Sequence, residues 1–538
     1  MNLISRRLDL GSLALAVVFF SIVVFLLLSH PTSFWMVTDY EPLGLADALN
    51  MAYRLADRQM YEANGMAYHP GVPFYLMSWL ALALTGYPVA SGTNFFSAVL
   101  AHVEDYHRII LCLGALVGAA GVYVFGRAAR HLVPFGVTVA GLALWLVSTP
   151  ATLQMFKTVG IDAFAFLING LFVAVMVRLA YEKDIDPSIV VFAGCVGALA
   201  YLNKLSYIYI PLALWAAIFM KLAFCRVGLS RGVWLLTIYL GTVALMVLAT
   251  AFLVIGWDSF RDLWRYHQSV IMGSELYGTG DPTVVSAGEI RRAIAAIPVG
   301  HAYAVPIALF GGAALAIAGF VTGLKRAGEI PLAVLCIGTG VAAVLSALIV
   351  LKHYDIHYTA GVSATLPSCV VCGYLLIKSW RFAPRLVGTS LAAIVILWMA
   401  GQQKQPLSYL LNDRMEENRR ANADLEEINS YVAGSKRAVE FAYKAPFAQF
   451  GEGFVVIYGS VPRLTYEYFE SRPQVISSLM AGLVTRDVGI YVIDKGYFPT
   501  VESVKAAPNL ALLDPKPVKF TDGDRLIELR TVFLLIRG

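Results

Sequence analysis

Two acidic residues directly follow the first apolar stretch of the chain. Asp39 and Glu41, in T-D-Y-E-P (38–42), come shortly after Trp35, an aromatic residue typical of the water–lipid boundary. A carboxylate at such a boundary is partly desolvated, which favours a role as general base or as half of a metal site. The alternative for Asp39 is an N-cap of the helix expected over 43–60. Asp39 is therefore the candidate base, and Glu41 is its partner in the acidic motif.

A third acidic residue and a lysine stand at the ends of later apolar stretches. Asp162 opens one stretch, in K-T-V-G-I-D-A-F (157–164), and Lys204 occupies the short N-K turn between two others. A cation in such a turn can bind an anionic lipid headgroup. Capping of a helix by Asp162 and snorkelling of Lys204 toward water are the alternatives.

The segment K-H-Y-D-I-H-Y (352–358) concentrates titratable and aromatic side chains before a late apolar stretch. His353 and His357 have the spacing of a metal-binding pair on a helix, but the glutamate of a zinc-protease motif is absent. We therefore expect the two histidines to hydrogen-bond to phosphate or sugar, with Tyr354 and Tyr358 as stacking partners.

The polar loop 257–300 carries a second mixture of aromatic and basic side chains. Trp264, Arg265 and His267 are the candidates there for contacts with carbohydrate and phosphate. An interfacial aromatic belt is the alternative explanation for the same residues.

The elements that must position these residues are membrane-spanning helices. A bilayer core needs roughly 20 apolar residues of helix, and about eleven stretches of that kind occur in residues 1–400. They lie near 12–30, 106–127, 133–150, 161–180, 188–203, 205–224, 232–256, 301–323, 329–351, 359–377 and 383–400. A further stretch, 72–86, is too short, and we expect it to be a juxtamembrane helix.

Loop charge indicates which side of the membrane each loop faces. Cytoplasmic loops carry an excess of Lys and Arg, and a count of eleven spans makes every predicted inner loop basic. Counting 72–86 as a span would move the Arg127 and Arg130 loop outside. Eleven spans also place the long polar segments 31–105, 257–300 and 401–538 together on the outer side. Of the nine histidines, only His131 then falls inside.

Composition agrees with a membrane protein and excludes several other classes. Hydrophobic residues make up 58% of the 538 residues and charged residues only 14%, below the quarter usual in soluble domains. The net charge of +5 is spread over span ends, so nucleic acid is not expected as a partner. The six cysteines lie in or beside apolar stretches, and we expect the C-x-x-C of Cys369 and Cys372 to be structural.

The C-terminal part, residues 401–538, changes character. Charged residues become frequent, and apolar runs shorten to strand length at 453–459, 489–493 and 526–536 after a polar helical stretch at 412–434. We therefore predict two domains: an all-α membrane domain over 1–400 and a small soluble α/β domain over 401–538.

Several short motifs together resemble the GT-C superfamily of membrane glycosyltransferases, in the branch of the protein O-mannosyltransferases and bacterial aminoarabinose transferases. The motifs are, in chain order, the acidic pair Asp39 and Glu41, H-P-G-V-P-F-Y (69–75) for a juxtamembrane H-P-P segment, Asp162 opening the fourth span, L-N-K (202–204), and the Tyr/His-rich stretch 352–358. The chain has D-Y-E where the family has adjacent acidic residues. Gly71 replaces the second proline, and we expect it to loosen the juxtamembrane helix.

The resemblance implies transfer of a sugar from a polyprenyl-phosphate donor to a lipid- or protein-linked acceptor on the outer face, with inversion. Asp39 would be the base, and Asp162 would bind or orient the acceptor. The residues expected to contact the donor phosphate or sugar are Arg58, His69, Lys204, His353, Tyr354, His357 and Tyr358. No cofactor is required because Arg, Lys and His can neutralise the leaving phosphate, although a divalent metal is possible.

Two other functions share this topology: a secondary transporter, and a non-catalytic subunit of polysaccharide assembly or polymerisation. Transporters place charges near the bilayer midplane and show internal repeats, whereas these charges lie at one face and the halves show no repeat. The chain has no Asn-x-Ser/Thr sequon, which favours a bacterial inner membrane with the C-terminal domain outside the cytoplasm.

Overall fold

The protein is described from a computed structural model. The residues that the structure describes are 9–29, 71–84, 103–157, 161–273, 282–283, 286–379, 395–408, 414–433, 438–441, 475–477, 488–510 and 517–538.

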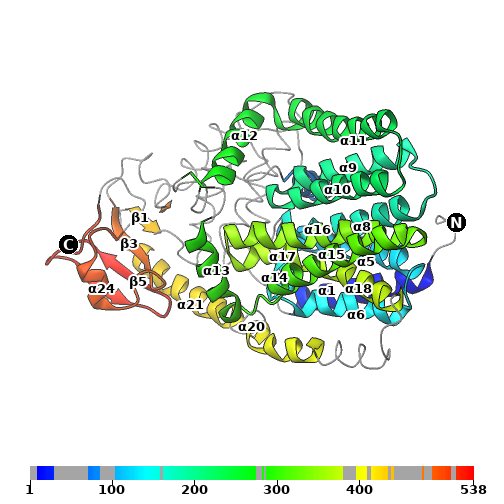
Figure 1. Cartoon of the computed structure of the whole chain (residues 1–538). Coiled ribbons are helices and arrows are strands. Elements are labelled where there is room, and N and C mark those ends of the chain that lie inside the picture. Colours follow the sequence, from blue (N-terminus) through cyan, green and yellow to red (C-terminus); the bar gives the residue numbers. More distant parts are fainter. Residues whose placement is uncertain are drawn as a thin grey trace.

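Helices dominate the described residues among the first 400 (Figure 1). The α-helices are α1 (Leu10–Ser29), α3 (Val72–Leu84), α5 (Val103–Arg130), α6 (Phe135–Val147), α7 (Ala151–Lys157), α8 (Ala165–Tyr181), α9 (Pro187–Asn203), α10 (Tyr209–Phe224), α11 (Leu229–Thr250), α12 (Trp257–Met272), α13 (Ala287–Val299), α14 (Ala304–Pro306), α15 (Gly312–Lys325), α16 (Ile330–Lys352), α17 (Thr359–Ser363) and α18 (Leu366–Ser379). Short 3-10 turns join several of them: η2 (Ile161–Phe164), η3 (Leu205–Ile208), η7 (Ala327–Glu329) and η8 (Ile356–Tyr358). Two π-helical turns are η4 (Ala251–Ile255) and η6 (Ile307–Gly311).

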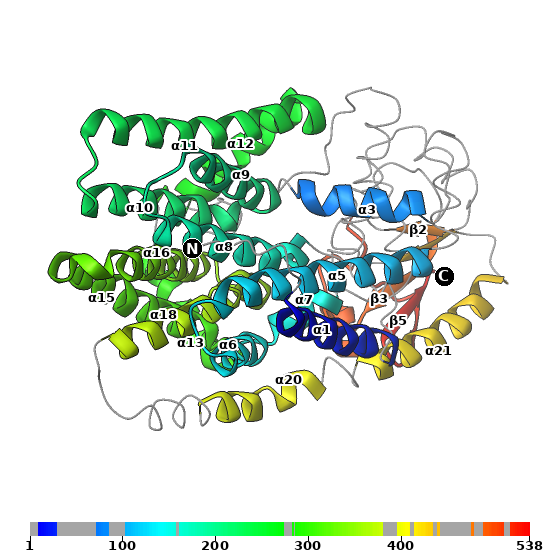
Figure 2. The ribbon, with the colours of Figure 1, turned by 90° about the vertical axis from the view of Figure 1, so that its right-hand side faces the viewer.

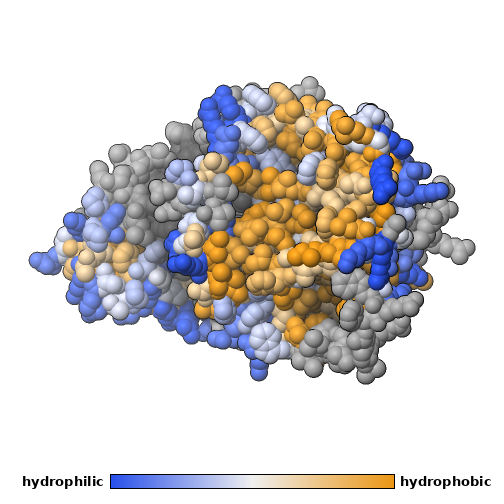
Figure 3. Space-filling view, viewed as in Figure 1, coloured by the Kyte–Doolittle hydropathy of each residue, from blue (hydrophilic) through white to orange (hydrophobic). Residues whose placement is uncertain are grey.

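Eight helical segments of the described residues are long and apolar enough to cross a membrane. They are Leu10–Ser29, Asp105–Arg130, Asp162–Tyr181, Leu205–Phe224, Leu229–Val254, Ala304–Lys325, Ile330–Lys352 and Ile356–Ser379. Their outward side chains form a broad apolar surface between more polar ends (Figure 3). The expectation of a multi-pass helical membrane protein is therefore confirmed.

The exact number of spans stays a prediction. Two of the expected spans are short helices, because α6 has 13 residues and α9 has 17. The expected span 133–150 is shorter than predicted because α6 ends before Ser148 and Pro150. Most of the expected last span, 383–400, lies outside the described residues. The stretch predicted to be juxtamembrane forms α3, a helix of 13 residues that packs against α5 and α9.

Polar contacts tie helices together at one common end. Arg130, at the end of α5, forms an ion pair with Asp9, which precedes α1. Lys221, near the end of α10, donates to the backbone oxygens at the end of α8. Arg326, after α15, donates to Ser379 at the end of α18. These basic residues belong to the loops predicted to face the cytoplasm.

Glycines allow neighbouring helices to approach one another closely in the helical core. Within a membrane the hydrophobic effect does not drive helices together, so association relies on the close packing that small residues permit. A Cβ added at Gly121 of α5 would lie 2.7 Å from the backbone nitrogen of Leu167 in α8. A Cβ at Gly340 of α16 would lie 2.5 Å from the backbone oxygen of Gly312 in α15. Trp145 adds a stacked contact with Phe166, with ring centroids 3.7 Å apart.

The described residues of the C-terminal region include a five-stranded sheet with helices on both faces. Its elements are α20 (Lys404–Ser408), α21 (Arg414–Ala433), β1 (Ala438–Phe441), β2 (Val475–Ser477), β3 (Val488–Asp494), α24 (Val501–Ala506), β4 (Arg525–Glu528) and β5 (Val532–Ile536). The strand order is β2-β1-β3-β5-β4, with β1 parallel to β2 and β3, and β5 antiparallel to both its neighbours. In β5, Leu534 packs in the cluster with α21, whereas Phe533 and Leu535 pack with Val504 of α24.

The elements expected from sequence in this region are borne out where the structure describes them. The polar helix appears as α21, and the run 489–493 appears as β3. The run 526–536 is two antiparallel strands, β4 and β5, because the chain turns between them. The run 453–459 lies outside the described residues.

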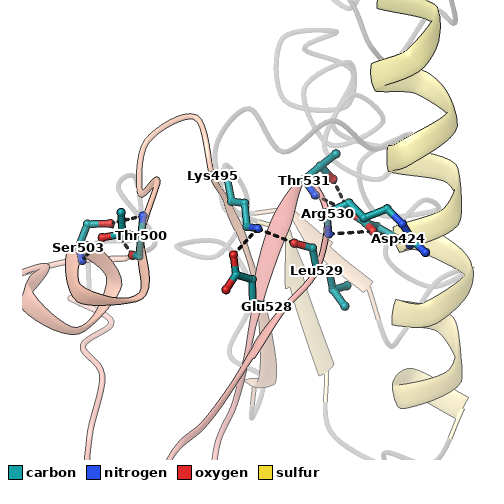
Figure 4. A network of polar contacts seen from close by, with 8 residues as sticks. All are labelled: Asp424, Lys495, Thr500, Ser503, Glu528, Leu529, Arg530 and Thr531. Atoms are coloured by element: carbon teal, nitrogen blue, oxygen red, sulfur yellow. Dashed lines mark hydrogen bonds and ion pairs between the residues drawn. The ribbon is translucent and has the colours of Figure 1, made fainter.

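A buried carboxylate holds this turn against α21 (Figure 4). Asp424, on α21, is fully buried, and its Oδ2 accepts from the backbone nitrogen and the hydroxyl of Thr531 at 2.6 and 2.7 Å. Its Oδ1 accepts from the backbone and the guanidinium of Arg530, each at 3.1 Å. These bonds compensate for burial of the charge and orient the β4–β5 hairpin.

Candidate functional site

The candidate site is centred on Asp162, which stands in the 3-10 turn η2 immediately before α8. Phe164 is the N-cap residue of α8, so Asp162 does not take that position. The Asp162 carboxylate instead bonds across the fold, to Lys204 and Tyr207. The capping alternative for Asp162 is therefore wrong, because its two oxygens serve long-range partners.

Lys204 supplies the charge opposite Asp162. Its Nζ lies 2.8 Å from Asp162 Oδ2, and its side chain is 1% exposed against 15% for Asp162. The residue links α9 to η3 in an extended conformation, which turns its side chain toward η2. Snorkelling toward water is excluded by this burial. A charge removed from water in this way needs a close partner, and Asp162 provides it.

Tyr207 completes the contact with the second carboxylate oxygen. Its hydroxyl donates to Asp162 Oδ1 at 2.7 Å, and the residue is 1% exposed. The Tyr207 ring packs directly on the backbone of α17, where a Cβ at Gly361 would come within 2.7 Å of it. Sequence reasoning missed this residue, although it stands only three positions after Lys204, on the next turn of the chain.

The segment before α17 closes the other side of the lysine. The ring of Tyr358 faces Lys204 Nζ, with 4.8 Å between the ammonium and the ring centroid. His357 packs on Tyr358 with centroids 4.0 Å apart, and its Nδ1 lies 2.8 Å from Asp355 Oδ1. Burial raises the pKa of the Asp355 carboxyl, but its hydrogen bonds with His357 and the charge of that ring lower it by more, to below its ordinary value.

His353 and His357 do not form the metal pair that their spacing on a helix would allow. α16 ends at Lys352, and the chain is non-helical until η8, so the two rings are not on one helix face. His353 Nε2 donates to the backbone oxygen of Val270, at the end of α12, at 3.2 Å. Burial lowers the pKa of His353, so this imidazole is neutral at pH 7.

Tyr354, also an expected site residue, and the neighbouring Lys352 contact other helices. Tyr354 packs in the cluster with α13 and α14, and burial raises its pKa to about 12. Lys352 donates to the backbone oxygen of Ile271 in α12. The contacts of Lys352, His353 and Tyr354 therefore hold the loop to neighbouring helices.

The three candidates on α12 divide between its two faces. Trp264 and Arg265 are 49% and 68% exposed, and Arg265 pairs with Asp262 one turn earlier. His267 is buried and turned to the bundle, where its Nδ1 lies 3.1 Å from the hydroxyl of Tyr201 in α9. Trp264 and Arg265 thus lie on a surface, whereas His267 anchors α12 beside the helix that leads to Lys204.

The described part of the expected motif 69–75, which begins at Gly71, is bonded to the residue before Lys204. The Gly71 backbone nitrogen donates to the oxygen of Asn203, directly before Lys204, at 3.1 Å. Gly71 has a positive φ of 56°, and a Cβ there would lie 2.4 Å from the ring of Tyr75. Gly71 thus provides a bond and a backbone conformation that a proline cannot, and its expected loosening of the helix stays a prediction.

Four expected site residues lie outside the described residues: Asp39, Glu41, Arg58 and His69. Among the residues that the structure describes, no group of three His, Cys, Asp or Glu is arranged to hold a metal ion. The described cluster therefore consists of Asp162, Lys204, Tyr207, Tyr358 and His357.

This arrangement is suited to binding and orientation at one end of the helices. Asp162 can accept further hydrogen bonds through its remaining lone pairs. Lys204 is already neutralised by Asp162 and covered by Tyr358. No family model matches the chain, and no curated protein or solved structure is detectably similar to it.

Proposed function

We propose that the protein is a GT-C-like membrane glycosyltransferase. It would move a sugar from a polyprenyl-phosphate donor to the hydroxyl of a lipid A, lipid-linked glycan or protein acceptor. The observation that carries the proposal is the buried Asp162–Lys204–Tyr207 cluster, which joins two segments far apart in sequence, η2 and the turn from Lys204 into η3, at one end of the helices. A buried ion pair costs desolvation energy, so its assembly beside polar loops suggests a functional site rather than a packing solution.

The chemistry that fits this proposal needs a base, an oriented acceptor and a stabilised leaving group. Asp39 would take the proton of the acceptor hydroxyl, whose oxygen then forms a bond to the anomeric carbon as the bond to phosphate oxygen breaks. The anionic lipid phosphate would leave against basic side chains, of which Arg58 and His357 are the candidates. Attack opposite the leaving group inverts the anomeric configuration.

The location of charge favours this proposal over a secondary transporter. Within the described spans, ionisable Asp, Glu, Lys and Arg side chains stand near helix ends, as Asp162 and Arg178 do in the segment Asp162–Tyr181. A transporter would place such groups near the midplane. We further propose that this end faces the outside of a bacterial inner membrane, with the C-terminal α/β domain on the same side.

The decisive test is transfer by the purified full chain in lipid nanodiscs. Short-chain polyprenyl-phosphate donors with a radiolabelled hexose or pentose are offered with lipid A, a lipid-linked glycan or a peptide. Asp39→Asn should reduce transfer by about a hundredfold or more, because an amide cannot accept the proton. Divalent cation and chelator are tested in parallel, which decides whether metal is required.

The matched control is Asp105→Asn, since Asp105 is an exposed carboxylate at the start of α5 whose partner is Arg108. This variant should transfer sugar at the rate of the unmodified protein. Full transfer by Asp39→Asn would overturn the assignment of the base. Absence of transfer by the unmodified protein with all donors and acceptors would overturn the proposed function.

A further inference from the structure

The exposures within the cluster are unequal. Lys204 and Tyr207 are each 1% exposed, whereas the Asp162 side chain is 15% exposed. A ligand therefore meets the carboxylate first, and the ammonium and the phenol lie behind it. A lysine that binds phosphate must be accessible to the ligand before a neighbouring carboxylate is, and here the carboxylate is the more accessible of the two.

The charge of the cluster also disfavours an anion. Asp162 and Lys204 together are neutral, and the face of Tyr358 covers a further side of the ammonium. An incoming phosphate would be repelled by the carboxylate, which is more accessible than Lys204, before it reached the ammonium. A hydroxyl group, in contrast, can donate to a carboxylate oxygen that already accepts one bond from the protein.

We infer that Lys204 and Tyr207 are positioning residues that hold the Asp162 carboxylate as an oriented acceptor for a hydroxyl group of the acceptor substrate. The inference rests on the proposed glycosyl transfer and reassigns Lys204, which the family resemblance places at the donor phosphate. Each partner restrains one oxygen: Lys204 holds Oδ2 and Tyr207 holds Oδ1. Two restraints on different oxygens fix the plane of the carboxylate as well as its position.

The ring of Tyr207 is held by its neighbours, so removal of its hydroxyl tests the bond to Asp162 alone. Its ring packs on the backbone at Gly361 and edge-on against Tyr209, with ring centroids 6.0 Å apart. Tyr207→Phe keeps these ring contacts and removes only the bond to Asp162. The neighbouring Tyr209 offers a matched change, because its hydroxyl bonds instead to Asn169 and to the backbone oxygen of Gly361.

The test is steady-state transfer by the full chain in nanodiscs, with acceptor and donor varied separately and thermal stability measured in parallel. Tyr207→Phe should lower kcat/KM for the acceptor by about tenfold, the loss expected for a hydrogen bond to a charged group, and leave the donor KM unchanged. Tyr209→Phe should lose thermal stability to a similar extent and keep both kinetic constants. Asp162→Glu retains the charge that Lys204 needs and moves the carboxylate by one methylene. It should show the same acceptor-specific loss, and this result decides the matter if Tyr207→Phe does not fold.

An increase in donor KM for Tyr207→Phe, or acceptor kinetics equal to those of Tyr209→Phe, would overturn the inference. In both cases transfer by the unmodified protein would leave the proposed function standing. If the unmodified protein transfers no sugar, the proposed function fails and the inference fails with it. Failure of the inference is therefore seen in the variants, and failure of the proposed function is seen in the unmodified protein.

Discussion

At the scale of residues, the energetics of the candidate site depend on one ion pair. The Lys204 ammonium is 1% exposed and is opposed by a carboxylate that is itself mostly buried. Removing one member of such a pair leaves a buried charge without compensation, whereas removing both members with similar volume is often tolerated. We therefore expect each member of the pair to be needed for stability only while the other is present.

This asymmetry gives a prediction for stability. Asp162→Asn should lower the free energy of unfolding by about 3–5 kcal/mol, because the Lys204 charge stays buried. The double variant Asp162→Asn with Lys204→Met should recover most of this loss, since no charge is left behind. Thermal unfolding in detergent, followed by intrinsic fluorescence, measures both. Equal destabilisation of the single and double variants would show that the charge is not the cause.

At the scale of elements, helix packing depends on glycines at close crossings. α15 and α16 approach so closely that their backbones meet at Gly312 and Gly340, where each glycine lies against the backbone oxygen of the other. A side chain at this crossing cannot be accommodated by rotation, because the obstacle is backbone. α16 also ends at the loop that carries Tyr358, so its position affects the site.

Gly340→Ala is expected to destabilise the protein by about 1–3 kcal/mol through overpacking of α15 on α16. The matched control is Gly373→Ala in α18, where an added Cβ meets nothing within 4 Å. Helix propensity alone would make both substitutions stabilising, so the two variants separate packing from propensity. Thermal unfolding of each variant in the same detergent is the measurement. Unchanged stability of Gly340→Ala would contradict the close crossing.

At the scale of the whole molecule, the two ends of the helices have different chemistry. One end carries the basic ties Arg130, Lys221 and Arg326. The other end carries the Asp162 cluster, and α12 is bonded beside it through His267. Figure 2 shows the N-terminal helices α1 and α5 lying side by side, as the ion pair between their ends requires. The basic end is expected to face the cytoplasm.

This orientation is tested by cysteine labelling in spheroplasts with a membrane-impermeant maleimide, in a background without native cysteines. Glu502→Cys, in α24 of the C-terminal domain, should react in intact spheroplasts. Lys325→Cys, at the basic end of α15, should react only after permeabilisation. Both positions are exposed, so burial does not limit labelling. The reverse pattern would place the candidate site on the cytoplasmic face.

The sequence by itself determined the features that depend on local patterns. Apolar stretches of helical length predicted the membrane helices, and short apolar runs predicted extended chain where β3, β4 and β5 lie, without the turn that divides β4 from β5. Burial follows composition over a few turns, so hydropathy is enough for these elements. The sequence also selected Asp162, Lys204 and Tyr358 as candidates, because polar groups at span ends are costly and few.

Only the tertiary structure decided which of these residues act together. Asp162, Lys204 and Tyr358 lie on separate helical segments, and their meeting depends on how α8, α9 and α17 pack. Tyr207 could not be distinguished from an ordinary core tyrosine until its hydroxyl was placed against Asp162. His353, five residues before Tyr358, bonds instead to the end of α12. Side-chain partners across a fold are set by helix rotation and register, which local hydropathy does not encode.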